Sequence, residues 1–110
     1  MSAKFDLHLK LFDELVDQCD RFQRKGKSVP YTSANGHMFS LLNKEGELGI
    51  RFGKEAQKSY QKELKTGDLM SHGATMRGYV HIPEDKMNET ELLIKMLNES
   101  YDYVMSLDPK

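Results

Sequence analysis

The sequence predicts an α+β fold, a two-layer sandwich in which helices pack on an antiparallel sheet in the order α-β-β-β-α-β-α. Three observations support it: apolar residues at helical spacing over 5–22, two alternating apolar segments at 38–42 and 48–52, and a second helical pattern over 92–107. A length of 110 residues suits one domain, so we expect a single domain spanning 1–110.

The first helix is predicted from apolar residues at 3.6-residue spacing, namely Phe5, Leu9, Phe12, Val16, Cys19 and Phe22. Charged residues occupy the other positions, which is typical of an amphipathic helix with one buried face. The pattern predicts about six turns. Gly26 follows the last basic residues and is a candidate C-cap.

Three strands are expected next, at residues 29–32, 38–42 and 48–52. Pro30 predicts that the first is an edge or irregular strand, since proline cannot donate a backbone hydrogen bond. Asn35-Gly36 is typical of a tight turn between strands. In the third strand Leu48, Ile50 and Phe52 alternate with Gly49 and Arg51, which predicts one buried face.

The second half of the chain is predicted to be helix, loop, strand and helix. Residues 54–65 are good helix formers with few apolar positions, so this helix should pack lightly. Residues 66–73 are expected to form a loop, because glycine and polar residues break any period. Residues 76–82 alternate as a strand. Asn88 is expected to cap the final helix in a capping box with Glu91.

The composition of the chain limits the classes of function that we expect. Lys+Arg number 16 and Asp+Glu 17, a net charge of -1, so nucleic-acid binding is not favoured. Cys19 is the single cysteine, which suits a reducing compartment. The first residues lack an apolar signal segment, and no apolar run approaches the ~20 residues that span a bilayer. We therefore expect a cytoplasmic protein without a membrane segment.

No motif predicts a catalytic residue, a metal site or a cofactor. The four histidines show no metal-binding spacing, and neither a nucleophile elbow nor a phosphate-binding glycine loop occurs. Cys19 lies on the apolar stripe and is expected to be a core residue. A candidate ligand pocket lies between the sheet and the 66–73 segment, with lining residues His37, His72, Tyr79 and His81.

A candidate partner surface combines a basic cluster with apolar residues of the last helix. Its residues are Arg21, Arg24, Lys25, Lys27, Tyr103 and Met105. The cluster could contact an acidic partner or a phosphate backbone, although most such clusters are solvated helix ends. Tyr103 and Met105 are more apolar surface than one packing seam needs, which favours a protein partner or a second copy.

Several segments resemble the N-terminal domain of the TfoX/Sxy family. His37-Met38-Phe39-Ser40-Leu41, Gly46-Glu47-Leu48-Gly49-Ile50-Arg51 and Met76-Arg77-Gly78-Tyr79-Val80-His81-Ile82-Pro83-Glu84-Asp85 are similar to its strands and the start of its last helix. Tyr31-Thr32-Ser33-Ala34 departs from the family's Met-Phe-Gly-Gly, and the chain stops before the family's helical C-terminal domain. The resemblance implies a two-layer fold without catalytic residues and a regulator of natural competence that acts with a transcription activator.

The leading hypothesis is thus a non-enzymatic protein-interaction module with a regulatory role, acting with a protein partner or as a homodimer. The second is a small-molecule-binding protein or an enzyme of unrecognised type that uses the candidate pocket. The third is weak nucleic-acid binding through residues 21–27, which would fall with added salt.

Overall fold

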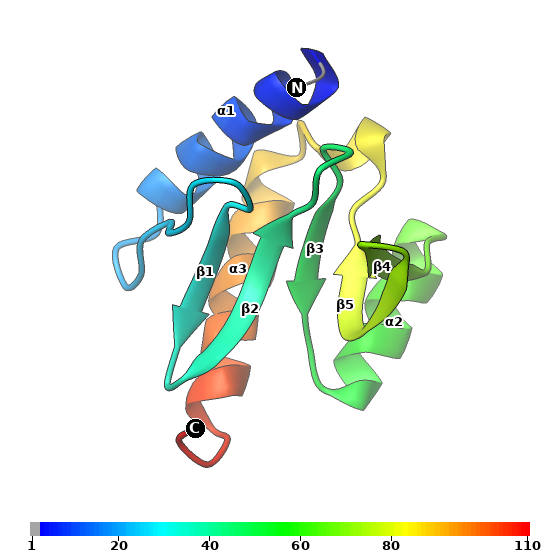
Figure 1. Cartoon of the computed structure of the whole chain (residues 1–110). Coiled ribbons are helices and arrows are strands. Elements are labelled where there is room, and N and C mark those ends of the chain that lie inside the picture. The colour runs from blue at the N-terminus through cyan, green and yellow to red at the C-terminus, as the bar shows by residue number, and fades with distance from the viewer. Residues whose placement is uncertain (1–2) are drawn as a thin grey trace.

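The computed structural model describes residues 3–110 and shows one antiparallel sheet with all helices on one side (Figure 1). The elements are α1 (Ala3–Asp17), β1 (Tyr31–Ala34), β2 (His37–Leu42), β3 (Leu48–Arg51), α2 (Lys54–Leu64), β4 (Asp68–Ser71), β5 (Ala74–His81), the 3-10 turn η1 (Glu84–Lys86) and α3 (Thr90–Met105). In space the strands run β1-β2-β3-β5-β4. The predicted α+β class and element order are confirmed, with β4 as an additional strand.

The main core lies between the sheet and the helices. Phe12 of α1, Phe39 of β2, Ile50 of β3 and Leu97 of α3 are all fully buried there. α3 packs behind β1, β2 and β3, and α2 packs behind β5. The Ser100 hydroxyl of α3 donates to the Arg51 carbonyl, which fixes the helix against the centre of the sheet.

The first helix is shorter than predicted, since α1 ends at Asp17. Cys19 and Phe22 are nevertheless buried, because the irregular segment after α1 folds back along the core. Phe22 stacks on Tyr101 of α3 with ring centroids 5.5 Å apart. The spacing of apolar residues therefore predicted burial correctly but not helical backbone. Gly26 is likewise not a C-cap; its φ of 86° belongs to the loop that the bridge between Lys25 and Tyr31 closes.

The segment 66–73 is not a loop, because β4 and β5 form a hairpin with the turn at His72-Gly73. This hairpin carries Leu69 onto the sheet face opposite the helices, where the residue is fully buried. A Cβ atom added to Gly49 would lie 2.5 Å from Leu69 Cδ2. Gly49 thus makes room for Leu69.

The final helix begins later than the predicted capping box. α3 starts at Thr90, and Glu89 occupies the N-cap position without a side-chain capping bond. Asn88 is exposed and precedes the cap, since the turn η1 and the following residues fill the approach to the helix.

Candidate functional site

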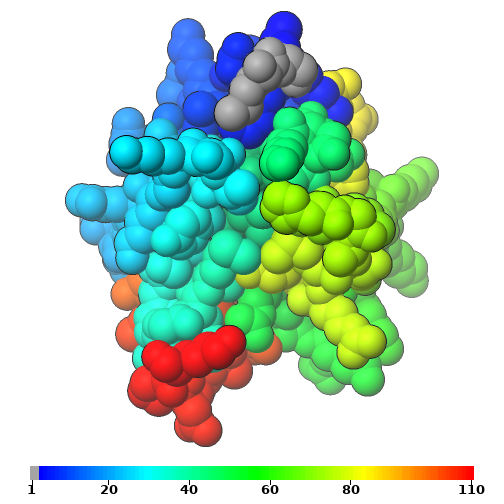
Figure 2. All heavy atoms as spheres, viewed as in Figure 1, coloured from blue at the N-terminus to red at the C-terminus, as the bar shows by residue number. Residues whose placement is uncertain are grey.

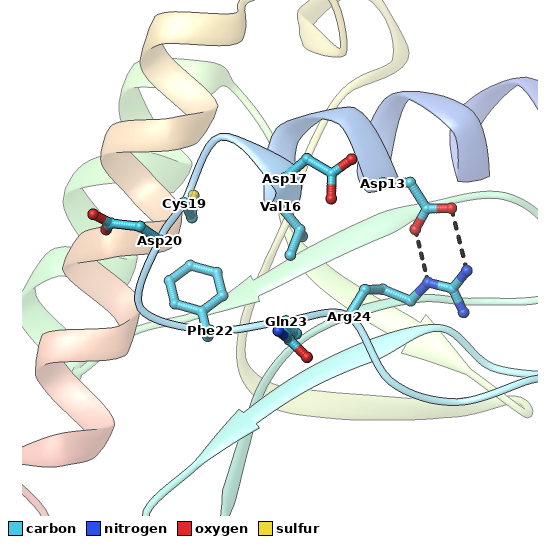
Figure 3. A pocket seen from close by; sticks show the side chains of 8 residues that line it. All are labelled: Asp13, Val16, Asp17, Cys19, Asp20, Phe22, Gln23 and Arg24. Atoms are coloured by element: carbon cyan, nitrogen blue, oxygen red, sulfur yellow. Dashed lines mark hydrogen bonds and ion pairs between the residues drawn. The ribbon is translucent and has the colours of Figure 1, made fainter.

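A groove of about 620 Å³ lies between α1 and the segment that follows it. Val16 and Phe22 project into the space between these segments (Figure 3). The acidic residues Asp13, Asp17 and Asp20 lie around its rim. The groove is open to solvent and mostly polar, so it forms a seam between two segments rather than an enclosed site.

Arg24 closes one side of this groove through a bidentate ion pair with Asp13 (Figure 3). Its Nε lies 2.7 Å from Asp13 Oδ1, and its Nη2 lies 3.2 Å from Oδ2. A third bond joins Nη1 to the Gly26 carbonyl. The hydrogen bond to Asp13 raises the pKa of Arg24. Planar two-bond pairing fixes orientation, so Arg24 holds the irregular segment against α1.

The predicted basic cluster is divided by such contacts. Arg21 donates to Asp102 and to Asn98 on α3, and its guanidinium lies 4.5 Å from the centre of the Tyr101 ring. Arg21 and Arg24 therefore already have carboxylate partners within the chain. Lys25 donates to Ser33 Oγ at 3.1 Å, and Lys27 is exposed. The structure does not bring the four cations together as one free patch.

Cys19 is a buried thiol that donates to the Leu15 carbonyl. Burial raises its pKa, and the nearby Asp20 carboxylate raises it further. A thiol acts as a nucleophile when its pKa is lowered and the sulfur is accessible. Cys19 has neither property, and its position matches the expected core role.

The four candidate pocket residues are spread over the sheet. Leu41, Gly49 and His81 lie in one row of paired residues, so His37 is four residues along β2 from that row, roughly 13 Å. His37 Nε2 donates to the Asp108 carbonyl at the C-terminal end of the chain. His72 is exposed in the β4–β5 turn.

The space expected between the sheet and residues 66–73 is filled by Leu69. Tyr79 is buried beside it and donates to the Met38 carbonyl at 2.7 Å. Burial raises the pKa of Tyr79 to about 12. His81 Nε2 lies 3.6 Å from Glu47 Oε2, near a small cavity of about 80 Å³ between α1 and the β2–β3 turn. The sequence did not predict this filling, because residues 66–73 were expected to form a loop and not to include the strand β4.

The apolar part of the predicted partner surface is also divided. Tyr103 lies beside Gly53 under the Arg51 guanidinium, which is 5.7 Å from the ring centre. Met105 is 48% exposed near the end of α3. Only Met105 of this pair presents a large exposed apolar side chain.

The sheet face without helices carries a second apolar cluster, which was not predicted. Leu41, Leu69 and Tyr79 are its buried members, and Val29, Tyr31, Met38 and Met76 pack on them half-buried. We call this surface the open face. Figure 2 views it directly: β1 and β2 in cyan to teal and the β4–β5 hairpin in yellow-green form its surface. Tyr79 alternates with the core residues Val80 and Ile82 and could have signalled it, whereas Leu69 gave no strand signal.

Other site types have little support in residues 3–110. Within that range no three His, Cys, Asp or Glu side chains are grouped so that they could hold a metal ion. No helix of the described chain is long and apolar enough to cross a membrane. Comparison with known proteins found no match among family models, curated proteins or solved structures.

Proposed function

We propose that this chain is a non-enzymatic protein-interaction module that acts in the cytoplasm and serves a regulatory role. The observation that carries the proposal is the open face, an apolar cluster that lies outside the helix-covered core and is only partly buried. Apolar clusters left on a surface mark interaction sites more often than chance. The TfoX/Sxy resemblance supports a regulatory role, because that family acts with a transcription activator.

Several chemically capable side chains are already engaged in the fold, which supports a binding role over catalysis. Cys19 is protonated and buried, Tyr79 donates to a strand carbonyl, and the Tyr60 hydroxyl donates to Glu99. Burial, and then the Glu99 bond, raise the pKa of Tyr60. An acid, base or nucleophile needs a pKa near the working pH and access to substrate.

Affinity capture tests the proposal. The tagged full chain is incubated with lysate of the source cells, with and without nuclease, and bound proteins are quantified. We expect a protein partner that survives nuclease and rebinds after purification. Loss of all partners on nuclease treatment would favour the nucleic-acid hypothesis. Turnover of an added metabolite, abolished by one side-chain substitution, would favour an enzyme.

A further inference from the structure

We propose that the open face binds an acidic, apolar segment of a protein partner. This inference rests on the proposed function and adds to it a place and a chemical class of partner. The argument depends on the apolar floor of the face, on the sign of the charges around it, and on what a second copy would encounter there.

The floor of the open face is apolar and only partly covered. Leu41, Leu69 and Tyr79 are at most 6% exposed, so the floor is firmly packed. Tyr31, Met38 and Met76 lie over them half-buried, and no helix of residues 3–110 crosses this side of the sheet. Flexible methionine side chains adapt to different apolar partners. The floor therefore offers contacts for apolar side chains of a bound segment.

The charges around this floor are positive. Lys25 lies beside β1, where its Nζ reaches Ser33 Oγ. Lys27 is exposed in the segment that leads into β1, and Arg77 is exposed next to Met76 in β5. Lys25 and Lys27 thus come from the β1 side of the open face, and Arg77 comes from β5.

The strands of the sheet supply little acidic charge that could neutralise these cations. The five strands contain a single acidic residue, Asp68. Its carboxylate accepts hydrogen bonds from Gln57 and Gln61 of α2. Glu47 accepts a bond from Asn43 and lies near His81. The rim is thus complementary to carboxylates on a partner, and such complementarity supports specificity and association rate.

Two other occupants fit less well. A second copy bound face to face would bring two cationic rims together, and like charges oppose such pairing. Nucleic acid would gain from the cations, but single strands bind by stacking on exposed rings. The Tyr79 ring is buried with its hydroxyl bonded and Tyr31 is half-buried, so neither ring is fully exposed, while the whole chain has a net charge of -1. An acidic protein segment with apolar side chains could contact the apolar floor and pair its carboxylates with the cations around it.

The test uses the full chain labelled with ¹⁵N and three synthetic peptides of equal length with identical leucine and phenylalanine positions. The intervening positions carry glutamate in one peptide, lysine in the second and glutamine in the third. A single-stranded thymidine oligonucleotide is the fourth probe. Binding is followed by backbone amide shifts, and light scattering reports self-association of the chain alone.

We expect the glutamate peptide to bind saturably and to shift amides of β1, β2 and β5. The variant Lys25→Glu/Lys27→Glu/Arg77→Glu should weaken this binding about tenfold. A charge-matched control, Lys54→Glu/Lys58→Glu/Lys62→Glu, changes exposed residues of α2 and should bind like the unmodified chain. Retained amide dispersion in both variants shows that they fold.

Several results would overturn the inference. These are equal binding of the lysine and glutamate peptides, shifts confined to the helical layer, tighter binding of the oligonucleotide at the same face, and a stable dimer closed over the open face. No saturable binding of any peptide would also reject it. Because affinity capture can still yield a partner in each case, a failure of this inference is distinguishable from a failure of the proposed function.

Discussion

At the residue scale, the contact between Gly49 and Leu69 decides the shape of the open face. Glycine at this position lets the β4–β5 hairpin lie against β3, and Leu69 is fully buried as a result. A side chain at position 49 would push into Leu69, so the smallest residue of the strand determines how its neighbour packs.

Substitution of this glycine tests the contact. Gly49→Ala should lower the free energy of unfolding by about 1–3 kcal/mol, because the new Cβ would lie 2.5 Å from Leu69 Cδ2. Gly67→Ala is the matched control, since a Cβ there has no atom within 4 Å. Urea unfolding measures both. Equal stability of the two variants would show that Leu69 can move away at little cost.

Ionisation of Tyr79 is expected to lower the stability of the fold at alkaline pH. Burial raises its pKa in the folded chain to about 12, from an ordinary value of about 10. The folded state thus holds the Tyr79 proton more tightly than the unfolded state. The resulting contribution to the free energy of unfolding is fully present below pH ~10 and is lost as the pH rises toward ~12.

The expected loss is about 1–2 kcal/mol over that window, after allowance for solvent screening. Tyr79→Phe cannot titrate and should lose less over the same window. At neutral pH the variant should be about 1 kcal/mol less stable, since the bond to the Met38 carbonyl is absent. Unfolding midpoints measured across the alkaline range compare the two chains. Parallel loss in both would contradict a role for Tyr79.

At the element scale, the β1–β2 turn supports the end of α3. The Asn35 amide donates to the carbonyls of Val104 and Leu107, which lie at and just beyond the end of α3, where the regular helical hydrogen bonds stop. Asn35 also has a φ of 56°, a conformation that asparagine tolerates better than most residues. One side chain thus links the turn to the helix end.

Two substitutions separate these roles. Asn35→Gly keeps the backbone conformation but removes both hydrogen bonds, and it should cost about 1 kcal/mol. Asn35→Ala adds backbone strain and should cost about 1–2 kcal/mol more. Hydrogen exchange in the last turn of α3 should rise in both variants. Unchanged exchange would show that the helix end does not depend on Asn35.

The sequence predicted the elements in which the spacing of apolar residues matches the repeat of the backbone. It missed the elements whose conformation depends on contacts with residues distant in the chain. The alternation of Leu48 and Ile50 identified β3, because one face of this strand is buried in the main core. Cys19 and Phe22 continued the helical spacing, yet ion pairs of Arg21 and Arg24 accompany an irregular segment there. Such partners lie far apart in the sequence, so local pattern does not reveal them.

The candidate sites were predicted less accurately than the fold, for the same reason. His37 and His81 were both assigned to the candidate pocket, but sheet register places them well apart along their strands. The open face depends on β4 curling over Gly49, and residues 68–71 carry only one buried position, Leu69. A single buried residue gives no period from which to predict a strand.

At the scale of the whole molecule, the sheet is covered by helices on one side and carries the open face on the other, with Lys25 and Lys27 beside β1. The acidic residues Asp13, Asp17 and Asp20 lie with α1 and the segment after it. Opposite charges thus occupy different parts of the surface although the net charge is -1. Binding of a partner should therefore depend on the charges of the face that it contacts, rather than on the net charge of the chain.

Quantitative affinity capture with three forms of the chain tests the central claim most directly. Nuclease-treated lysate of the source cells is divided among the unmodified chain, the Lys25→Glu/Lys27→Glu/Arg77→Glu variant and the Lys54→Glu/Lys58→Glu/Lys62→Glu control. A partner protein held by the unmodified chain and the control, but lost from the first variant, is the predicted result. Equal capture of that partner by all three forms, or no protein enriched by any of them, would contradict binding through the open face.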